Sequence, residues 1–141
     1  MASIKVSTGL KVYDIEDENG NVRGQISFNP SDLGFYDRAT QFYDDMQTMV
    51  DSIENDDSIV GMEKVSAADK AMKEKLNQLF DDENASKVVF GNQNCFNTLN
   101  GVSFVERFLN AFMPIIKKEF EKEKKNSQKR IEKYTQGVGD K

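Results

Sequence analysis

The sequence has no histidine and no tryptophan, and it contains a single cysteine and two prolines in 141 residues. Histidine is the usual general base near neutral pH and the commonest metal ligand, so its absence disfavours most hydrolases and metalloenzymes. Cys95 has no second cysteine for an internal disulfide, and as a nucleophile it would need a base that the chain lacks. We therefore expect a protein that is not an enzyme.

Motifs for bound ions and cofactors are missing as well. An EF-hand loop that began at Asp81 would need glycine at its sixth position and glutamate at its twelfth, where the chain has Ser86 and Asn92. The sequence contains neither of the common glycine patterns that bind phosphate groups. We expect no catalytic residue, no metal and no cofactor.

Long hydrophobic runs are also absent. A membrane-spanning helix needs roughly 20 consecutive apolar residues, whereas the most apolar stretch, residues 104–120, is interrupted by charged side chains. The first residues lack the apolar core of a secretory signal. The sequence therefore predicts a cytoplasmic protein that does not bind a membrane.

Charge is unevenly distributed along the chain, although the total is only −5. Residues 1–116 hold 19 acidic residues against 10 basic ones, whereas residues 117–141 hold 9 basic residues against 5 acidic ones. A basic segment can bind nucleic acid through phosphate contacts, but glutamates alternate with the lysines here and only Tyr134 offers a ring for stacking. We predict no nucleic-acid binding.

Residues 4–28 are predicted to form a β-hairpin. Asn19-Gly20 is typical of a two-residue type I′ turn, in which both central residues have positive φ. A turn at this position pairs Tyr13 with Ile26. It also gives the hairpin one apolar face, made by Tyr13, Ile15, Val22, Ile26 and Phe28.

Residues 30–53 are predicted to form an amphipathic helix, with Asn29 as its N-cap and Pro30 at its first position. Its apolar residues recur at intervals of three or four, which places them on one helical face. They are Phe35, Ala39, Phe42, Met46, Met49 and Ile53. The opposite face is acidic.

A polar loop is expected over residues 54–65, followed by a second helix over residues 66–80. Ser66 and Asp69 resemble a capping box at the start of this helix. The short apolar run at residues 88–90 fits either a brief strand or a buried connection, because three residues show no clear periodicity.

The last predicted helix covers residues 103–120 and begins at a capping box formed by Ser103 and Glu106. Pro114 lies inside it, so we expect a kink or a lost hydrogen bond there. Beyond this helix, residues 121–141 form a charged tail that is either helical or disordered, because they lack an apolar face.

These elements predict an α+β fold that is mainly α. An N-terminal β-hairpin is followed by three or four helices, and the last helix is long with a charged C-terminal extension. Residues 4–120 are expected to form a single domain, since a chain of this length fits one compact unit.

Three parts of the chain share a pattern with a known family. They are the segment from Val12-Tyr13-Asp14-Ile15 to Asn29-Pro30-Ser31-Asp32, the stretches Leu76-Asn77-Gln78-Leu79-Phe80 and Ser86-Lys87-Val88-Val89-Phe90-Gly91, and Phe104-Val105-Glu106-Arg107-Phe108-Leu109 with Pro114-Ile115-Ile116. Together they cover most of residues 10–120. In order and composition they resemble small tail-assembly-chaperone-like proteins from phages and prophages of Gram-positive bacteria.

The resemblance implies a non-enzymatic protein that helps to build a long, non-contractile tail in the host bacterial cytoplasm. Such a chaperone binds the tape-measure protein, keeps it soluble and helps to recruit tail-tube subunits. The implied partners are thus the tape-measure protein and the tail-tube protein, and a homo-oligomer is compatible with this role. The alternative is a structural virion component, either a tail-tube or a head–tail connector subunit, although such subunits are usually β-rich or ring-forming.

Residues of the two apolar helical stripes are the candidates for binding a partner. Methionine and phenylalanine suit an adaptable apolar groove, but the same residues also fill ordinary cores, and the sequence leaves both interpretations open. The candidates are Phe35, Phe42, Met46, Met49, Phe108 and Phe112.

Overall fold

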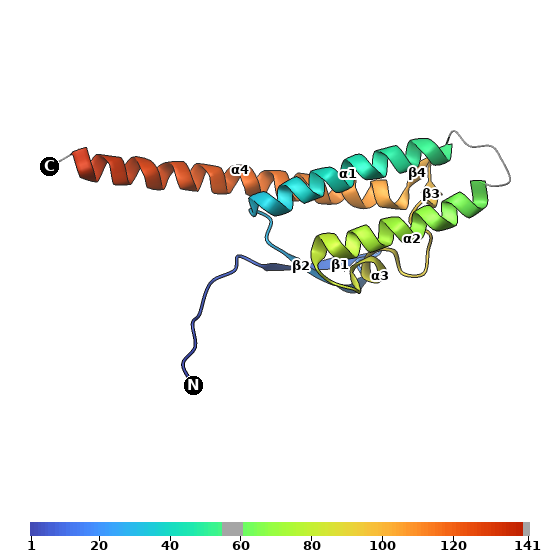
Figure 1. Cartoon of the computed structure of the whole chain (residues 1–141), viewed down its shortest axis with the longest axis horizontal. Coiled ribbons are helices and arrows are strands. Elements are labelled where there is room, and N and C mark those ends of the chain that lie inside the picture. Colours follow the sequence, from blue (N-terminus) through green and yellow to red (C-terminus); the bar gives the residue numbers. More distant parts are fainter. Residues whose placement is uncertain (55–60, 140–141) are drawn as a thin grey trace.

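A computed structural model describes residues 1–54 and 61–139 of the chain and confirms the α+β, mainly helical fold. Helices α1 (Leu33–Glu54) and α4 (Phe104–Gly139) lie side by side, and α2 (Gly61–Phe80) packs against α1 (Figure 1). Strands β1 (Lys11–Glu16) and β2 (Val22–Phe28) form the N-terminal hairpin, and the short α3 (Ala85–Phe90) packs against β2 and α2.

The hairpin has the predicted register over most of its length, with Tyr13 opposite Ile26. Its turn differs from the prediction, because a bulge at Ile15/Glu16 pairs Glu16 with Val22, and of the Asn19-Gly20 pair only Gly20 has a positive φ. The Asp17 carboxylate accepts hydrogen bonds from the backbone N–H groups of Asn19 and Asn21 at 2.9 and 3.0 Å, which stabilises this wider loop. The bulge leaves Val22 exposed instead of on the apolar face.

Helix α1 begins three residues later than predicted, and its N-cap is Asp32 rather than Asn29. The Asp32 carboxylate accepts a hydrogen bond from the N–H of Gly34 at 3.0 Å, and its carbonyl accepts one from Tyr36. Asn29 instead stabilises the turn before the helix, because its side-chain oxygen accepts hydrogen bonds from the N–H and hydroxyl of Ser31.

Helix α2 begins at Gly61, five residues before the predicted start, so the Ser66–Asp69 pair lies inside the helix and caps nothing. Val65 lies just before the predicted start and packs on the core in line with Ala68 and Met72, so it extends the apolar stripe of the helix towards its N-terminus. The predicted loop of residues 54–65 is therefore shorter, and its residues 55–60 lie outside the described part of the chain.

The apolar run at residues 88–90 belongs to helix α3, so it is not a strand, and its residues Val89 and Phe90 are buried. Ala85 and Val89 are one helical turn apart and both are buried, which is the helical spacing of core contacts. The helix ends at Gly91, which has a φ of 60° and donates its N–H to the carbonyl of Lys87.

A second ribbon, β3 (Thr98–Leu99) and β4 (Val102–Ser103), leads directly into α4 and was not predicted. Its turn is Asn100-Gly101, and both residues have positive φ, at 54° and 80°. This is the geometry of a type I′ turn. Ser103 caps α4 as predicted, because its Oγ accepts from the Glu106 N–H at 3.3 Å. The Glu106 carboxylate accepts from the Ser103 hydroxyl at 2.8 Å, in place of the backbone N–H of a full capping box.

Helix α4 continues unbroken through Pro114 and extends well past the other elements (Figure 1). The ring of Phe120 stacks on Tyr36 with centroids 4.9 Å apart, and this contact lies near the end of the packed part of α4. Residues 121–133 are all exposed. Of the two forms considered for the charged tail, the structure shows a helix as far as Gly139.

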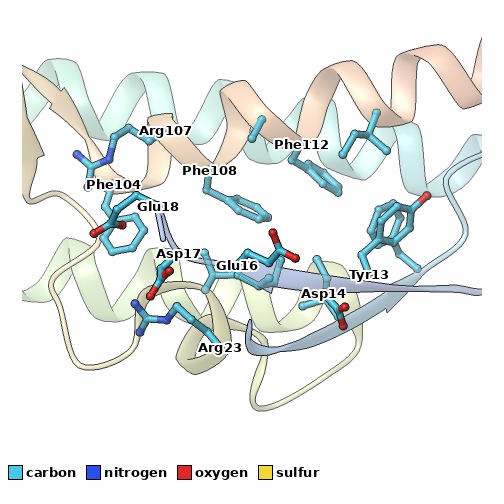
Figure 2. A pocket seen from close by; sticks show the side chains of 16 residues that line it. Tyr13, Asp14, Glu16, Asp17, Glu18, Arg23, Phe104, Arg107, Phe108 and Phe112 are labelled. Carbon is cyan, nitrogen blue, oxygen red and sulfur yellow. The ribbon is translucent and has the colours of Figure 1, made fainter. Parts of the chain in front are cut away.

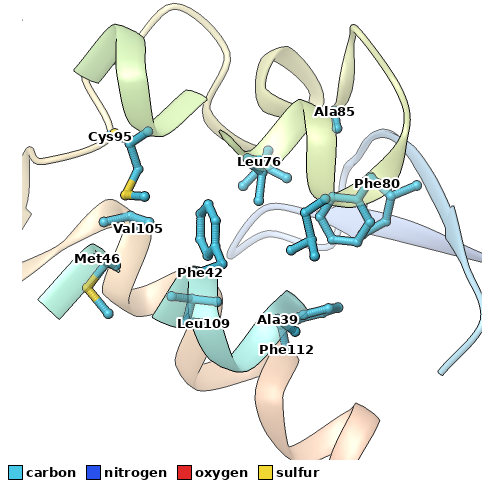
Figure 3. Packing of buried hydrophobic residues seen from close by; sticks show 14 of the residues in the cluster. Ala39, Phe42, Met46, Leu76, Phe80, Ala85, Cys95, Val105, Leu109 and Phe112 are labelled. Carbon is cyan, nitrogen blue, oxygen red and sulfur yellow. The ribbon is translucent and has the colours of Figure 1, made fainter. Parts of the chain in front are cut away.

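The core lies between the four helices and the hairpin, and Figure 3 shows its central part. Phe28 of β2 joins the hairpin to the helices, because its ring contacts aromatic rings from β1, α1, α2 and α4. These rings belong to Tyr13, Phe35, Phe80 and Phe112. Stacked and edge-on aromatic pairs of this kind stabilise a fold beyond the area that they bury.

Candidate functional site

An open groove of about 360 Å³ lies between β1 and α4 (Figure 2). One wall is made by six consecutive residues, from Tyr13 to Glu18. Tyr13 to Glu16 belong to β1, and because side chains of both its faces take part, the groove runs along this strand. Asp17 and Glu18 belong to the turn that follows, and Ile26 and Phe28 of β2 also line the groove. The other wall is the first half of α4, so segments about 90 residues apart in sequence form the groove.

Apolar side chains of α4 face into the groove at intervals of three or four residues. Phe104, Phe108 and Phe112 point from the helix towards β1 (Figure 2). The rings of Phe108 and Phe112 are stacked with centroids 5.3 Å apart, and Ile115, which is 38% exposed, continues the row. Because Phe108 is only half-buried, the groove offers apolar surface to a partner.

The strand side of the groove is acidic. Asp14, Glu16, Asp17 and Glu18 line it, against the two basic residues Arg23 and Arg107. Arg107 is already engaged at one end of the groove, where its guanidinium donates to the carbonyl of Val102 and lies 4.9 Å from the centre of the Phe104 ring. The groove therefore combines an apolar helical wall with a rim of net negative charge.

Asp17 keeps its negative charge at a lower pH than an ordinary aspartate. The hydrogen bond from the backbone N–H of Asn21, helped by the one from Asn19, lowers the pKa of the Asp17 carboxyl. A lowered pKa in the folded state contributes stability above the pKa of the unfolded chain, and this contribution is lost as the pH falls through the folded value. The Asp17 carboxylate thus remains charged throughout the neutral range.

The six candidate binding residues do not form one surface. Phe108 and Phe112 line the groove together. Phe35, Phe42 and Met46 are buried in the core, and Met49 is half-buried against it. Sequence reasoning missed the strand wall, although the alternating acidic residues at positions 14, 16 and 18 were visible before the turn.

Cys95 is a structural residue. Its side chain is fully buried, and its backbone N–H donates to the Asp69 carboxylate at 2.7 Å. Lys73 forms an ion pair with the other oxygen of the same carboxylate at 3.1 Å. Burial raises the pKa of the Cys95 thiol far above its ordinary value, and Asp69 acts in the same direction, so the reactive thiolate is disfavoured.

We expect Cys95 to react with Ellman's reagent only when the protein unfolds, because the thiol is buried and protonated. The measurement is the rate of modification in native buffer and in guanidinium chloride. An Asn97→Cys variant provides the control, since residue 97 is exposed in the same loop and its thiol should be modified at once. Rapid modification of the wild-type protein in native buffer would contradict the prediction.

The described residues form neither a cluster of metal ligands nor a membrane-spanning helix. They contain no group of three or more cysteine, aspartate or glutamate side chains placed to hold a metal ion. Among the helices in residues 1–54 and 61–139, none is long and apolar enough to cross a membrane.

No family model, curated protein or solved structure matches the chain. The tail-chaperone resemblance therefore rests on the quoted sequence segments alone. Of the residues in those segments, Tyr13, Ile15, Phe104, Phe108 and Ile115 are among those that line the groove.

Proposed function

We propose that this chain is a non-enzymatic binding protein that holds an apolar segment of a partner protein in the groove between β1 and α4. The observation that carries the proposal is the row of phenylalanine rings on α4 facing an acidic strand edge. A partner segment with one apolar side and basic flanks would bury its apolar side against the rings and place its basic residues at the rim.

The biological form of the proposal is a phage tail assembly chaperone. Its partner would be the tape-measure protein, which it would keep soluble while tail-tube subunits are recruited. A tape-measure protein is long and helical, so many copies of a small protein could cover it, each through a weak contact. The acidic body, with 19 acidic residues against 10 basic ones in residues 1–116, would keep such a complex in solution.

The test is co-expression with the tape-measure protein of the same phage, followed by measurement of soluble complex and of affinity for apolar segments of that protein. An Ile115→Asp variant should bind at least about tenfold more weakly, since it places a charge in the apolar wall. Ile115 is partly exposed, so the fold should persist.

A Leu99→Asp variant is the matched control, because Leu99 is an exposed apolar residue outside the groove. If the Ile115→Asp and Leu99→Asp variants bound the partner with equal affinity, the contact would lie outside the groove. The chaperone role would be contradicted if the yield of soluble tape-measure protein were the same with and without this chain. It would also be contradicted if this chain were present in stoichiometric amounts in mature tails.

A further inference from the structure

We propose that the N-terminal arm, residues 1–10, of one copy binds in the groove of a second copy as an added strand along the free edge of β1. The inference rests on the proposed function in one respect, since it assigns a competing occupant to the same groove. The occupant is a segment of this chain, and its chemistry follows from the described residues.

The arm is extended and leaves its apolar side chains in water. Ile4, Val6 and Leu10 are 91%, 76% and 60% exposed, and they alternate with polar residues as in a strand with one apolar face. Figure 1 shows the arm trailing away from the rest of the molecule. An apolar face of this kind gains stability when another surface covers it.

Gly9 directs the arm outwards. It has a φ of 77°, and a Cβ at this position would lie 2.6 Å from the side-chain nitrogen of Asn29. The same nitrogen donates a hydrogen bond to the carbonyl of Thr8 at 3.1 Å. The base of the arm is therefore fixed, and the residues before it point away from their own groove, which favours a groove on another copy.

The free edge of β1 is the acceptor. Within the described residues, β1 pairs only with β2, and β2 packs against α3 on its other side. A Cβ on Gly24 of β2 would lie 2.9 Å from Val88 of α3, so α3 covers a face of β2 closely. The edge of β1 that faces away from β2 is unpaired in the described part of the chain, and an open edge presents backbone groups to an incoming strand.

The two faces of an added strand match the two faces of β1. Tyr13 and Ile15 lie on the core side of the sheet, where Ile4 and Val6 would join them and face the rings of α4. Asp14 and Glu16 lie on the other side, where Lys5 would face them. Residues 1–10 contain no acidic residue, so the arm and the rim have complementary charge.

The arm and the partner protein would then compete for one groove. In the absence of the partner, copies would associate through their arms and cover the phenylalanine rings. A partner segment that binds more tightly would displace the arms, because both occupants need the same surface. The arm would thereby keep the groove closed until its partner is present.

The first experiment is sedimentation velocity over a concentration series with the full chain. Wild-type protein should associate, and an Ile4→Asp/Val6→Asp variant should require at least about tenfold more protein to do so. A Ser3→Asn/Ser7→Asn variant is the control, since it changes the opposite face of the arm and adds no charge that would face Asp14 and Glu16, and it should associate like the wild type. A wild-type protein that stays monomeric would overturn the proposal, as would equal effects of the two variants.

The second experiment exchanges the charges. Lys5→Glu and Glu16→Lys should each weaken association by about two- to fivefold, and the double variant should regain most of the loss. Additive loss in the double variant would show that these residues do not face each other and would overturn the proposed register.

A third measurement separates this inference from the proposed function. The Ile4→Asp/Val6→Asp variant should bind tape-measure segments more tightly than the wild type, because no arm competes. Loss of self-association without any binding of such segments by either protein would contradict the proposed function and leave the arm contact intact. If the wild type and the variant bound these segments equally tightly, the proposed function would stand. The proposal that the arm competes for the groove would be wrong.

Discussion

Replacing Phe28 with alanine is expected to lower the free energy of unfolding by about 3–5 kcal/mol. The side chain is 3% exposed, and its ring stacks on Tyr13 at 4.6 Å and on Phe35 at 5.2 Å between centroids. It also meets Phe112 edge-on at 5.1 Å. Removal of this ring leaves a cavity where the hairpin joins the helices, and the surrounding rings belong to four different elements that cannot all move inwards.

Chemical denaturation followed by far-ultraviolet circular dichroism measures the effect. Val12→Ala is the matched control, because Val12 lies on the same hairpin but is 62% exposed, and its replacement should change the stability by no more than about 0.5 kcal/mol. If the two variants were equally stable, the hairpin would not be docked on the helices as described.

Replacing Asp69 with alanine is expected to cost about 1–3 kcal/mol, the second largest effect. Its carboxylate accepts the N–H of Cys95 at 2.7 Å and is paired with Lys73 at 3.1 Å. The alanine variant leaves the buried N–H of Cys95 without an acceptor. It also releases the loop that joins α3 to the β3–β4 ribbon, which positions the start of α4.

Two further variants separate the hydrogen bond from the ion pair. Asp69→Asn keeps an oxygen that can accept from Cys95 and loses the charge, so most of the stability should remain. Lys73→Met removes the cation and keeps the carboxylate, and its effect should be within about 1 kcal/mol because the pair is partly exposed. A loss in Lys73→Met as large as that in Asp69→Ala would mean that the ion pair dominates.

The helical parts of the fold were predictable because their apolar residues repeat at three or four positions over long stretches. The spacing from Phe35 to Ile53 predicted α1, and the Ser103–Glu106 pair predicted the start of α4. Short elements were not predictable in this way. Three apolar residues at the end of α3 carry no period, and only the packing of Ala85 and Val89 shows that the segment is helical.

The two Asn-Gly pairs show the limit of a local signal. Asn19-Gly20 has the sequence of a type I′ turn, but the Asp17 side chain binds the loop backbone and selects a wider turn with a bulge. Asn100-Gly101 adopts the type I′ geometry, and its flanking strands are only two residues long. The dipeptide permits the turn, whereas the neighbouring side chains decide whether it forms.

The groove was beyond prediction because its two walls are far apart in the sequence. Periodicity places Phe108 and Phe112 on one face of the helix. It does not show that part of this apolar face extends beyond the residues that pack in the core. This remaining apolar surface of α4 faces β1 across the groove. The position of β1 depends on how the hairpin packs on the helices through Phe28. Only the assembled structure distinguishes the buried Phe42 from the half-exposed Phe108.

Helix α4 has 36 residues, which makes it about 54 Å long. Val105, Leu109 and Ile116 anchor its first half in the core, whereas every side chain in residues 121–133 faces water. A helix in a protein owes most of its stability to the packing of its apolar face. Amide protons in the first half should therefore exchange only when the whole molecule unfolds, and those in the second half should exchange through local fraying. α4 is therefore one continuous helix whose two halves differ in stability against local unfolding.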